Sequence, residues 1–298
     1  VPVNIIGVEY IVMRTFLNNQ DYVYVVATQA ATPIYVDGVL MTTLNAGQQY
    51  QIIFPTTYPT GYMKIASRKL STDPYKPIYV FHIGGFGCEQ GGAIVPPIDV
   101  CTGSTKVAFN RPKSSPFYLT MMVRDNAQDG FLVDGVVRND LLPPASFTLV
   151  PGTPWRVARL GSFTTAQFAV GSHVISNTKD IFHLGIVNGD AGTTCMYGYF
   201  SDFNKFDPKS FVVETGGPGN TLCYGESSQL FASGGTKYAW TPDDFLDDPF
   251  SDHPLASNVT KSIKYKVVVS GVCSLKDSGE IELIVAPYMD PKFTTDVF

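Results

Sequence analysis

An internal repeat constrains the fold of this chain more than any other feature of its sequence. The tetrapeptide VDGV occurs at residues 36–39 and again at 133–136, and the dipeptide Phe-His occurs at 81–82 and at 182–183. The two anchors keep the same order and return after 97 residues (36 to 133) and 101 residues (81 to 182). Because self-similarity at a fixed period indicates a duplicated unit, we predict two copies of one unit of about 100 residues. A single sandwich of double size is the alternative.

The sequence between the anchors predicts strands rather than helices. Aromatic residues, which pack well on pleated sheets, make up 13% of the chain. Turn-forming pairs such as Asp-Gly, Asn-Gly and Gly-Gly separate short apolar runs, as in β-sandwiches. Alternation of apolar and polar residues with a period of two, typical of half-buried strands, runs through residues 21–26, 50–54, 117–123, 263–269 and 281–285.

The predicted fold is therefore all-β, with tandem antiparallel β-sandwich units from an internal duplication and an Ig-like or PKD-like β-sandwich after them. The segment 202–210, DFNKFDPKS, interrupts the strand pattern with Asp, Asn and Pro and is a predicted linker. Trp240 is predicted to lie in the core of the last sandwich. The predicted boundaries are 1–104 for the first repeat unit, 105–208 for the second, 209–287 for the Ig-like module and 288–298 for a linker or tail.

A glycine-rich segment, FHIGGFGCEQGG at residues 81–92, raises the question of nucleotide binding. The dinucleotide pattern GxGxxG fails there, because Gln90 stands where the third glycine is required after Gly85 and Gly87. A phosphate loop must also lead into a helix, whereas the tandem prolines at 96–97 follow here. We therefore predict a tight turn whose glycines let the backbone pass close to another segment.

The charge and hydropathy of the sequence exclude some classes of binding partner. The net charge is −5, and residues 212–298 hold 6 Lys or Arg against 12 Asp or Glu. We see no basic cluster in the sequence, and without one neither nucleic acid nor an anionic membrane surface is an expected partner. No apolar run approaches the ~20 residues that span a bilayer, so direct membrane insertion is not expected.

The cysteine pattern favours disulfides and an extracellular location. None of the five cysteines forms a CxxC pair or has a histidine at metal-ligand spacing, so a zinc site is not expected. The predicted disulfides are Cys223–Cys273, which would join an early and a late strand of the last module, and Cys88–Cys101, which would close a small loop. Cys195 is a competing partner. Five reduced thiols in a cytosolic protein are the alternative.

The sequence contains no recognisable catalytic constellation. A nucleophile elbow GxSxG and the motif HExxH are both absent. His82 and His183 occupy equivalent positions of the repeat, which favours a structural role over catalysis. We therefore predict that the chain is not an enzyme, with paired carboxylates for glycosidic chemistry as the alternative.

An acidic stretch at residues 241–253 is the one candidate for a metal site. Carboxylate oxygens in a flexible loop suit calcium, although the spacing does not match an EF-hand. A solvated acidic crossover between strands is the alternative. No other cofactor is expected. The candidate calcium ligands are Asp243, Asp244, Asp247 and Asp248, with Asp252 in the same stretch.

Three stretches carry a resemblance to a known family. GFGCEQGGAIVPPIDVCTGS (85–104), VPGTPWRVARL (150–160) and FHLGIVNGDAGTTCMYGYFSDF (182–203) resemble the IgGFc-binding-protein N-terminal domain family. The last third, with CYGESSQLFASGGTKYAWTP (223–242) and KYKVVVSGVC (264–273), resembles the PKD-like or Ig-like repeats of large surface proteins. The combination is similar to gliding-motility adhesins of the Bacteroidetes type, which are exported by the type IX secretion system.

The resemblance implies a non-enzymatic adhesin segment at the cell surface, associated with the outer membrane and forming part of a longer chain. Its expected partners are surface polysaccharide or another extracellular ligand and neighbouring modules of the same filament, and its expected role is attachment to surfaces during gliding motility. The resemblance does not imply antibody binding. Two alternatives remain: structural spacer modules of a large filament, and a secreted glycan-active enzyme with an accessory module.

Overall fold

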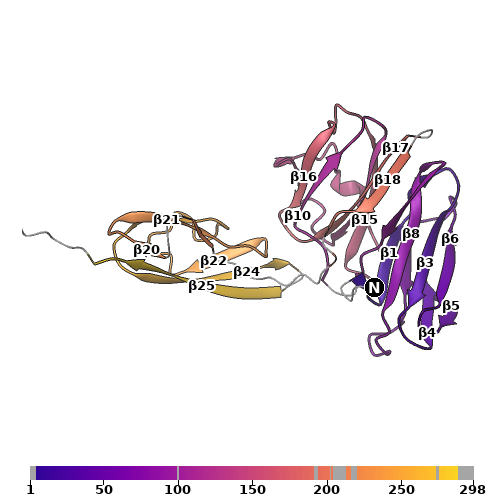
Figure 1. Ribbon diagram of the computed structural model, residues 1–298, viewed down its shortest axis with the longest axis horizontal. Helices are drawn as coiled ribbons and strands as arrows, with labels where there is room; N and C mark the ends of the chain where they lie inside the picture. Colours follow the sequence, from indigo (N-terminus) through magenta and orange to yellow (C-terminus); the bar gives the residue numbers. More distant parts are fainter. Residues whose placement is uncertain are drawn as a thin grey trace, which may run out of the picture. The chain divides into compact units, whose positions relative to one another are not determined.

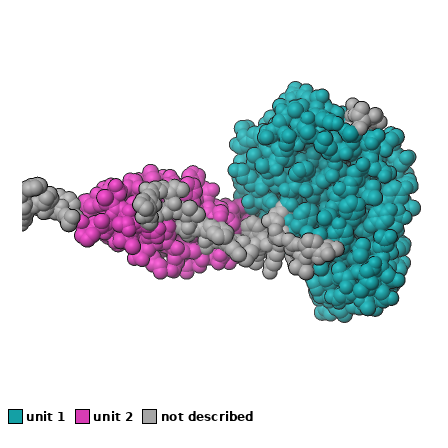
Figure 2. All heavy atoms as spheres, viewed as in Figure 1, with its two compact units in different colours: residues 1–206 teal, residues 207–298 magenta. Residues whose placement is uncertain are grey.

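The protein is all-β and forms two compact units, residues 1–206 and 207–298 (Figure 2). No α-helix occurs among the residues that the structure describes, and none of them forms a helix that could cross a membrane. The all-β prediction is therefore confirmed. The computed structural model describes residues 5–98, 101–190, 194–201, 203, 213–215, 220–272 and 275–287.

The first copy of the repeat is an antiparallel sandwich of two sheets (Figure 1). One sheet has the order β1-β7-β4-β5, and the other has the order β6-β3-β8 with β9 and β2 both paired to β8. Alternate side chains of the two sheets meet in one apolar core, which includes Val23, Phe54 and Met63. The strands are β1 (Glu9–Met13), β2 (Phe16–Leu17), β3 (Asp21–Ala27), β4 (Thr32–Val36), β5 (Val39–Leu44), β6 (Gln49–Phe54), β7 (Tyr62–Ala66), β8 (Ile78–Gly87) and β9 (Glu89–Ile94).

The second copy repeats this topology, except that among its described residues it has no counterpart of β2 and that it adds β14, which pairs with β15. The order β10-β16-β12-β13 matches β1-β7-β4-β5, and β15-β11-β17-β18 matches β6-β3-β8-β9. It has a separate core, which includes Phe117 and Phe168, so the duplication produces two sandwiches rather than one of double size. The strands are β10 (Lys106–Arg111), β11 (Phe117–Arg124), β12 (Phe131–Val133), β13 (Val136–Val137), β14 (Thr148–Leu149), β15 (Trp155–Phe163), β16 (Gly171–Asn177), β17 (Phe182–Asp190) and β18 (Thr194–Tyr199).

The first repeat anchor is a hairpin turn that forms hydrogen bonds with the neighbouring strand. The Asp-Gly pairs at 37–38 and 134–135 all have positive φ, between 47° and 82°, as type I′ hairpins require. The Asp37 amide donates to the Lys64 carbonyl at 2.8 Å, and Asp37 Oδ1 accepts the Lys64 amide at 2.7 Å. Asp134 makes the same two bonds with Val174, each at 2.8 Å. The VDGV sequence is thus repeated because each turn needs this Asp-Gly geometry.

The second anchor places a buried histidine in each copy. His82 on β8 is fully buried, and its Nε2 lies 3.1 Å from Asp21 Oδ2 on the neighbouring strand β3. Its Nδ1 lies 2.7 Å from the hydroxyl of Tyr197, which belongs to β18 of the second copy. His82 therefore links the two copies, which is the structural role that its repeated position indicates.

His183 occupies the equivalent position on β17 and is also fully buried. Its Nδ1 lies 2.8 Å from Ser201 Oγ and its Nε2 lies 3.2 Å from Thr102 Oγ1, so among the described residues its partners are hydroxyl groups rather than carboxylates. Burial lowers the pKa of His183 from 6.5 to about 3, because the low-dielectric interior disfavours the imidazolium form.

This depressed pKa predicts a loss of stability in mild acid. Above pH 6.5 neither the folded nor the unfolded state binds the proton, whereas between pH 6.5 and about 3 only the unfolded state binds it. Relative to a His183→Gln variant, the wild-type chain should lose about 2 kcal/mol of unfolding free energy between pH 7.5 and pH 5. Urea unfolding of both proteins at several pH values measures this difference. Parallel curves for the two proteins would contradict it.

The glycine-rich segment lies where the two copies meet. It forms the hairpin of β8 and β9, which packs against β18. A Cβ atom on Gly91 would lie 2.9 Å from Tyr197 Cβ, and one on Gly85 would lie 3.2 Å from Cys195 Sγ. The glycines therefore allow the backbones of the two copies to approach closely, as predicted.

Gly91→Ala should destabilise the first unit by about 1–3 kcal/mol, because the added methyl group overpacks the contact with Tyr197. Gly198→Ala is the matched control on β18, since its Cβ would meet only Phe200 Cε2 at 3.9 Å. We expect the control to stay within about 0.5 kcal/mol of wild type. Urea denaturation followed by circular dichroism compares the two, and equal unfolding free energies would contradict the role of Gly91.

The second unit is a smaller sandwich that agrees with the predicted Ig-like fold. Its sheets have the orders β19-β21-β23 and β20-β25-β24-β22. Trp240 is buried in the core, and its Nε1–H donates to the Ser251 carbonyl at 3.0 Å, so the predicted core position is confirmed. The strands are β19 (Val213–Thr215), β20 (Thr221–Leu222), β21 (Glu226–Phe231), β22 (Lys237–Thr241), β23 (Leu255–Val259), β24 (Ile263–Val272) and β25 (Leu275–Val285).

Candidate functional site

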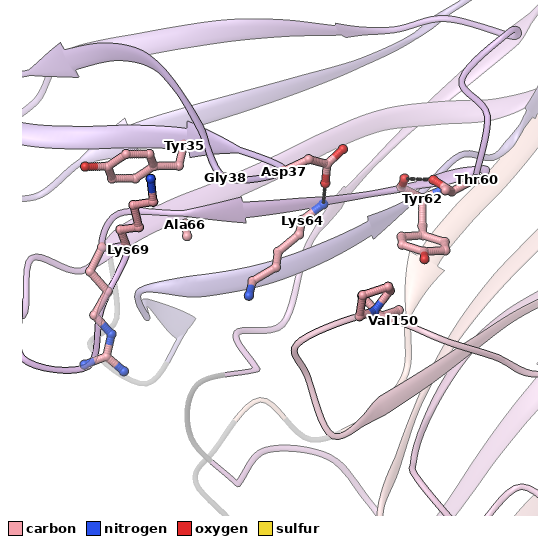
Figure 3. Close-up of a pocket in the computed structure, with 11 residues that line it drawn as sticks. Tyr35, Asp37, Gly38, Thr60, Tyr62, Lys64, Ala66, Lys69 and Val150 are labelled. Atoms are coloured by element: carbon pink, nitrogen blue, oxygen red, sulfur yellow. Dashed lines mark hydrogen bonds between the residues drawn. The ribbon is translucent and has the colours of Figure 1, made fainter.

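A cavity of about 380 Å³ opens on the outer face of β7 in the first copy (Figure 3). Its floor and one wall come from β7 and from Tyr35 of β4. Val150 and Pro151, which precede β15, close it from the second copy. The cavity therefore needs both copies of the repeat in the positions that the first unit gives them.

The period of β7 explains which side chains reach this cavity. Met63 and Ile65 point into the sandwich core and are fully buried. Tyr62, Lys64 and Ala66 alternate with them and line the cavity, because successive residues of a strand face opposite sides of a sheet. Figure 3 shows Tyr62 and Lys64 projecting from the same side of the strand.

Two smaller hollows adjoin the cavity and extend it into a groove. One, of about 150 Å³, shares Thr60 and Tyr62 with it. The other, of about 260 Å³, shares Tyr35 and Arg68. We call the three hollows together the β7 groove. Because the three hollows share lining residues, a ligand larger than any one of them could occupy more than one.

The β7 groove is basic, although the whole chain has a net charge of −5. Two carboxylates, those of Asp37 and Asp73, accompany five cations in its lining. The expectation that the chain has no basic cluster is therefore wrong for this face. Counting Lys, Arg, Asp and Glu over long stretches of sequence does not detect a local group of cations. The cations are Lys64, Arg68, Lys69, Lys76 and Arg159.

Both carboxylates of the groove accept backbone amides, Asp37 from the neighbouring strand β7 and Asp73 from its own turn. Asp37 accepts the Lys64 amide through Oδ1, and the hydroxyl of Tyr58 donates to its Oδ2. Asp73 Oδ2 accepts the amides of Leu70 at 2.8 Å and Lys69 at 2.9 Å. These amides, together with the charge of Arg68, lower the pKa of Asp73. Both groups are therefore engaged by the backbone, and neither is placed as an isolated acid or base.

The acidic stretch of the second unit does not gather into a metal site. Within the described part of the chain, no group of three or more His, Cys, Asp or Glu side chains is placed to hold a metal ion. The four predicted ligands, Asp243, Asp244, Asp247 and Asp248, are all exposed. Asp247 Oδ1 accepts the amides of Asp248 and Leu255, Asp248 Oδ1 accepts that of Phe250, and Asp244 lies 3.4 Å from Lys261. The solvated crossover is the arrangement observed.

Neither predicted disulfide is formed. Cys88 and Cys223 are free thiols, and Cys101 is disulfide-bonded but not to Cys88. Cys88 lies at the turn between β8 and β9, where its exposed Sγ is 3.9 Å from Asn18 Nδ2. The Cys88–Cys101 disulfide was predicted from the sequence spacing alone. Spacing does not show which way the Cys88 side chain points from the hairpin turn. Cys273 lies outside the described residues.

Sequence reasoning did not find the β7 groove, although one signal was available. Residues 62–69, YMKIASRK, place three cations within six positions of a chain that is acidic as a whole. The alternation of Tyr62 and Lys64 with apolar residues indicates a shared strand face. The contribution of residues 150–151 has no local signal, because it depends on how the two copies pack.

Comparisons with known proteins give one family match. A family model described as IgGFc binding protein matches residues 1–187. No curated protein matches the chain significantly. Solved structures with some similarity include an amphioxus IgVJ-C2 molecule (13% identity, TM-score 0.20, 61% of this chain and 98% of that chain). Another is a lectin from Pleurotus ostreatus in complex with GalNAc, with 10% identity and a TM-score of 0.20 over 85% of this chain and 86% of that chain. A third is a bacterial ice-binding adhesin, with 11% identity and a TM-score of 0.18 over 90% of this chain and 87% of that chain. TM-scores this low carry no functional argument.

Proposed function

Since the chain belongs to the IgGFc-binding protein family, we propose that it is a non-enzymatic extracellular binding module whose ligand occupies the β7 groove. The observation that supports this most is the groove itself, three adjoining hollows on a rigid sheet. The volume of its central hollow, about 380 Å³, falls within the range of ligand sites, which is roughly 300–1,000 Å³.

The shape of the β7 groove favours a polysaccharide as the ligand. A folded protein partner buries about 800 Å² on each side in a typical interface, which a narrow groove does not offer. An extended saccharide chain needs a narrow concave track with polar groups and an aromatic surface. Tyr35, half-buried at the junction of two hollows, provides such a surface. For this reason we do not extend the antibody ligand in the family name to this chain.

The state of the carboxylates supports a role in binding rather than hydrolysis. Glycosidases need two carboxyl groups that flank the scissile bond. In the groove, Asp37 and Asp73 instead hold backbone amides. A secreted glycan-active enzyme remains an alternative that incubation with soluble polysaccharides would reveal, since the release of reducing ends would contradict a purely binding role.

At a finer level, we propose that the chain is a segment of a cell-surface adhesin that attaches to polysaccharide during gliding motility and is exported by type IX secretion. This part of the proposal rests on the sequence resemblance alone. Spacer modules that only project a distal tip are the alternative. A parent protein whose residues 1–206 are replaced by unrelated sandwiches of equal length should lose attachment if these residues bind, and should keep it if they are spacers.

The binding proposal predicts that the chain is retained on immobilised polysaccharide and that Tyr35→Ala weakens this retention about tenfold, the effect of losing one aromatic contact. Tyr24→Ala is the matched control, because Tyr24 is also half-exposed but lies on β3, outside the groove. Biolayer interferometry on a panel of polysaccharides measures both variants. Absence of binding to every polysaccharide, or equal effects of the two substitutions, would contradict the proposal.

A further inference from the structure

In the described part of the chain, the one ion pair made by a cation of the β7 groove is the long contact between Lys64 and Glu9. Among the described residues, the carboxylate within 4 Å of Lys64 Nζ is that of Glu9, and it lies at 3.9 Å. The Arg68 guanidinium faces the ring of Tyr75 at 5.8 Å, and its buried Nε has no hydrogen-bond partner in the described part of the chain. The Lys76 ammonium donates to two neutral carbonyls, those of Ala30 and Ala31.

Some cations elsewhere on the protein are paired more tightly with carboxylates. Four ion pairs outside the groove bring nitrogen and oxygen within 2.6–2.8 Å of each other: Arg138–Asp140, Arg156–Asp125, Lys179–Asp129 and Lys264–Glu280. The chain thus has enough carboxylates to neutralise its cations, and the groove is a place where it does not do so.

The unneutralised charges converge on one concave surface. Lys64, Arg68 and Lys69 all line the central hollow, beside the ring of Tyr35. The walls of a cleft exclude high-dielectric water, so a cleft lined by charges of one sign focuses their field and attracts counter-ions. A ligand that carries anionic groups at intervals along a chain would meet these cations in turn.

From this geometry we propose that the β7 groove selects an acidic saccharide chain, whose carboxylate or sulfate groups pair with Lys64, Arg68 and Lys69 while a sugar ring packs on Tyr35. This inference rests on the proposed function and names its ligand class. Carboxylates and sulfates share the relevant chemistry, since both offer anionic oxygens to ammonium and guanidinium donors.

The groove fits a saccharide better than a nucleic acid. Sequence-tolerant binding of single strands requires several exposed aromatic rings on which successive bases stack. Here Tyr62 is buried and Tyr35 is half-buried.

The test compares acidic and neutral forms of one backbone. Isothermal titration of the full 298-residue chain with polygalacturonate should give affinity at least about tenfold higher than with carboxyl-reduced polygalacturonate, whose backbone is the same but uncharged. Dextran sulfate against dextran makes the same comparison for sulfate. Preference for either acidic polymer supports the inference and identifies the anionic group.

A double variant assigns the effect to the groove. Lys64→Gln with Lys69→Gln should weaken binding of the acidic polymer about tenfold, toward the affinity measured for the neutral polymer. The matched control, Lys106→Gln with Lys266→Gln, removes the same charge from exposed positions outside the groove and should bind as wild type does. Thermal unfolding of both double variants verifies that they fold.

The outcomes separate the two proposals. Equal binding of acidic and neutral polymers overturns the inference and leaves the proposed function in place. Absence of binding to every saccharide overturns the proposed function and the inference together. Equal losses in the two double variants, or polyuridylate RNA that binds as tightly as the acidic saccharide, also overturn the inference, because the attraction would then come from overall charge.

Discussion

The close contact between the two copies of the repeat is the constraint on which the rest of the first unit depends. His82 lies at its centre. Its Nε2 lies 3.1 Å from Asp21 Oδ2, and its Nδ1 lies 2.7 Å from the Tyr197 hydroxyl of the second copy. Burial raises the pKa of Tyr197 and keeps its hydroxyl protonated for this bond. A buried network of this kind is stabilising only when its members are paired, so it specifies one arrangement of the copies. The β7 groove follows from that arrangement, because Val150 and Pro151 must stand opposite β7.

A second set of contacts fixes the same boundary beside the network. The rings of Phe16 and Tyr118 stack with centroids 4.0 Å apart, and the Arg159 guanidinium lies 4.7 Å from the centroid of the Phe16 ring. Arg159 also donates to the Thr15 carbonyl at 2.7 Å, and the Thr15 hydroxyl donates to Asp21. One chain of contacts therefore connects the groove, in which Arg159 takes part, to the buried histidine.

The fold could be predicted from the sequence because the local backbone conformation and the buried hydrogen bonds each require particular residues at the two repeat anchors. An Asp-Gly turn with positive φ has few substitutes, and a buried histidine with fixed partners has few as well, so both persisted in the two copies. The groove and the cysteines could not be predicted in the same way. The groove joins residues 35, 62–69 and 150–151, which only tertiary packing brings together. The acidic stretch suggested calcium by composition, yet its carboxylates are used to cap turns, which composition does not show.

The contrast between an acidic chain and a basic groove itself bears on selectivity. The excess acidic charge lies in residues 212–298, and the first unit is nearly neutral apart from the groove, so its remaining surface adds little attraction for an acidic polymer. It gains where it can bend into the groove and place an anionic group near Lys64 or Arg68. Specificity arises when a binding surface opposes the wrong ligands as well as attracting the right one. The distribution of charge would then confine the attraction to the groove, which would provide the point of contact.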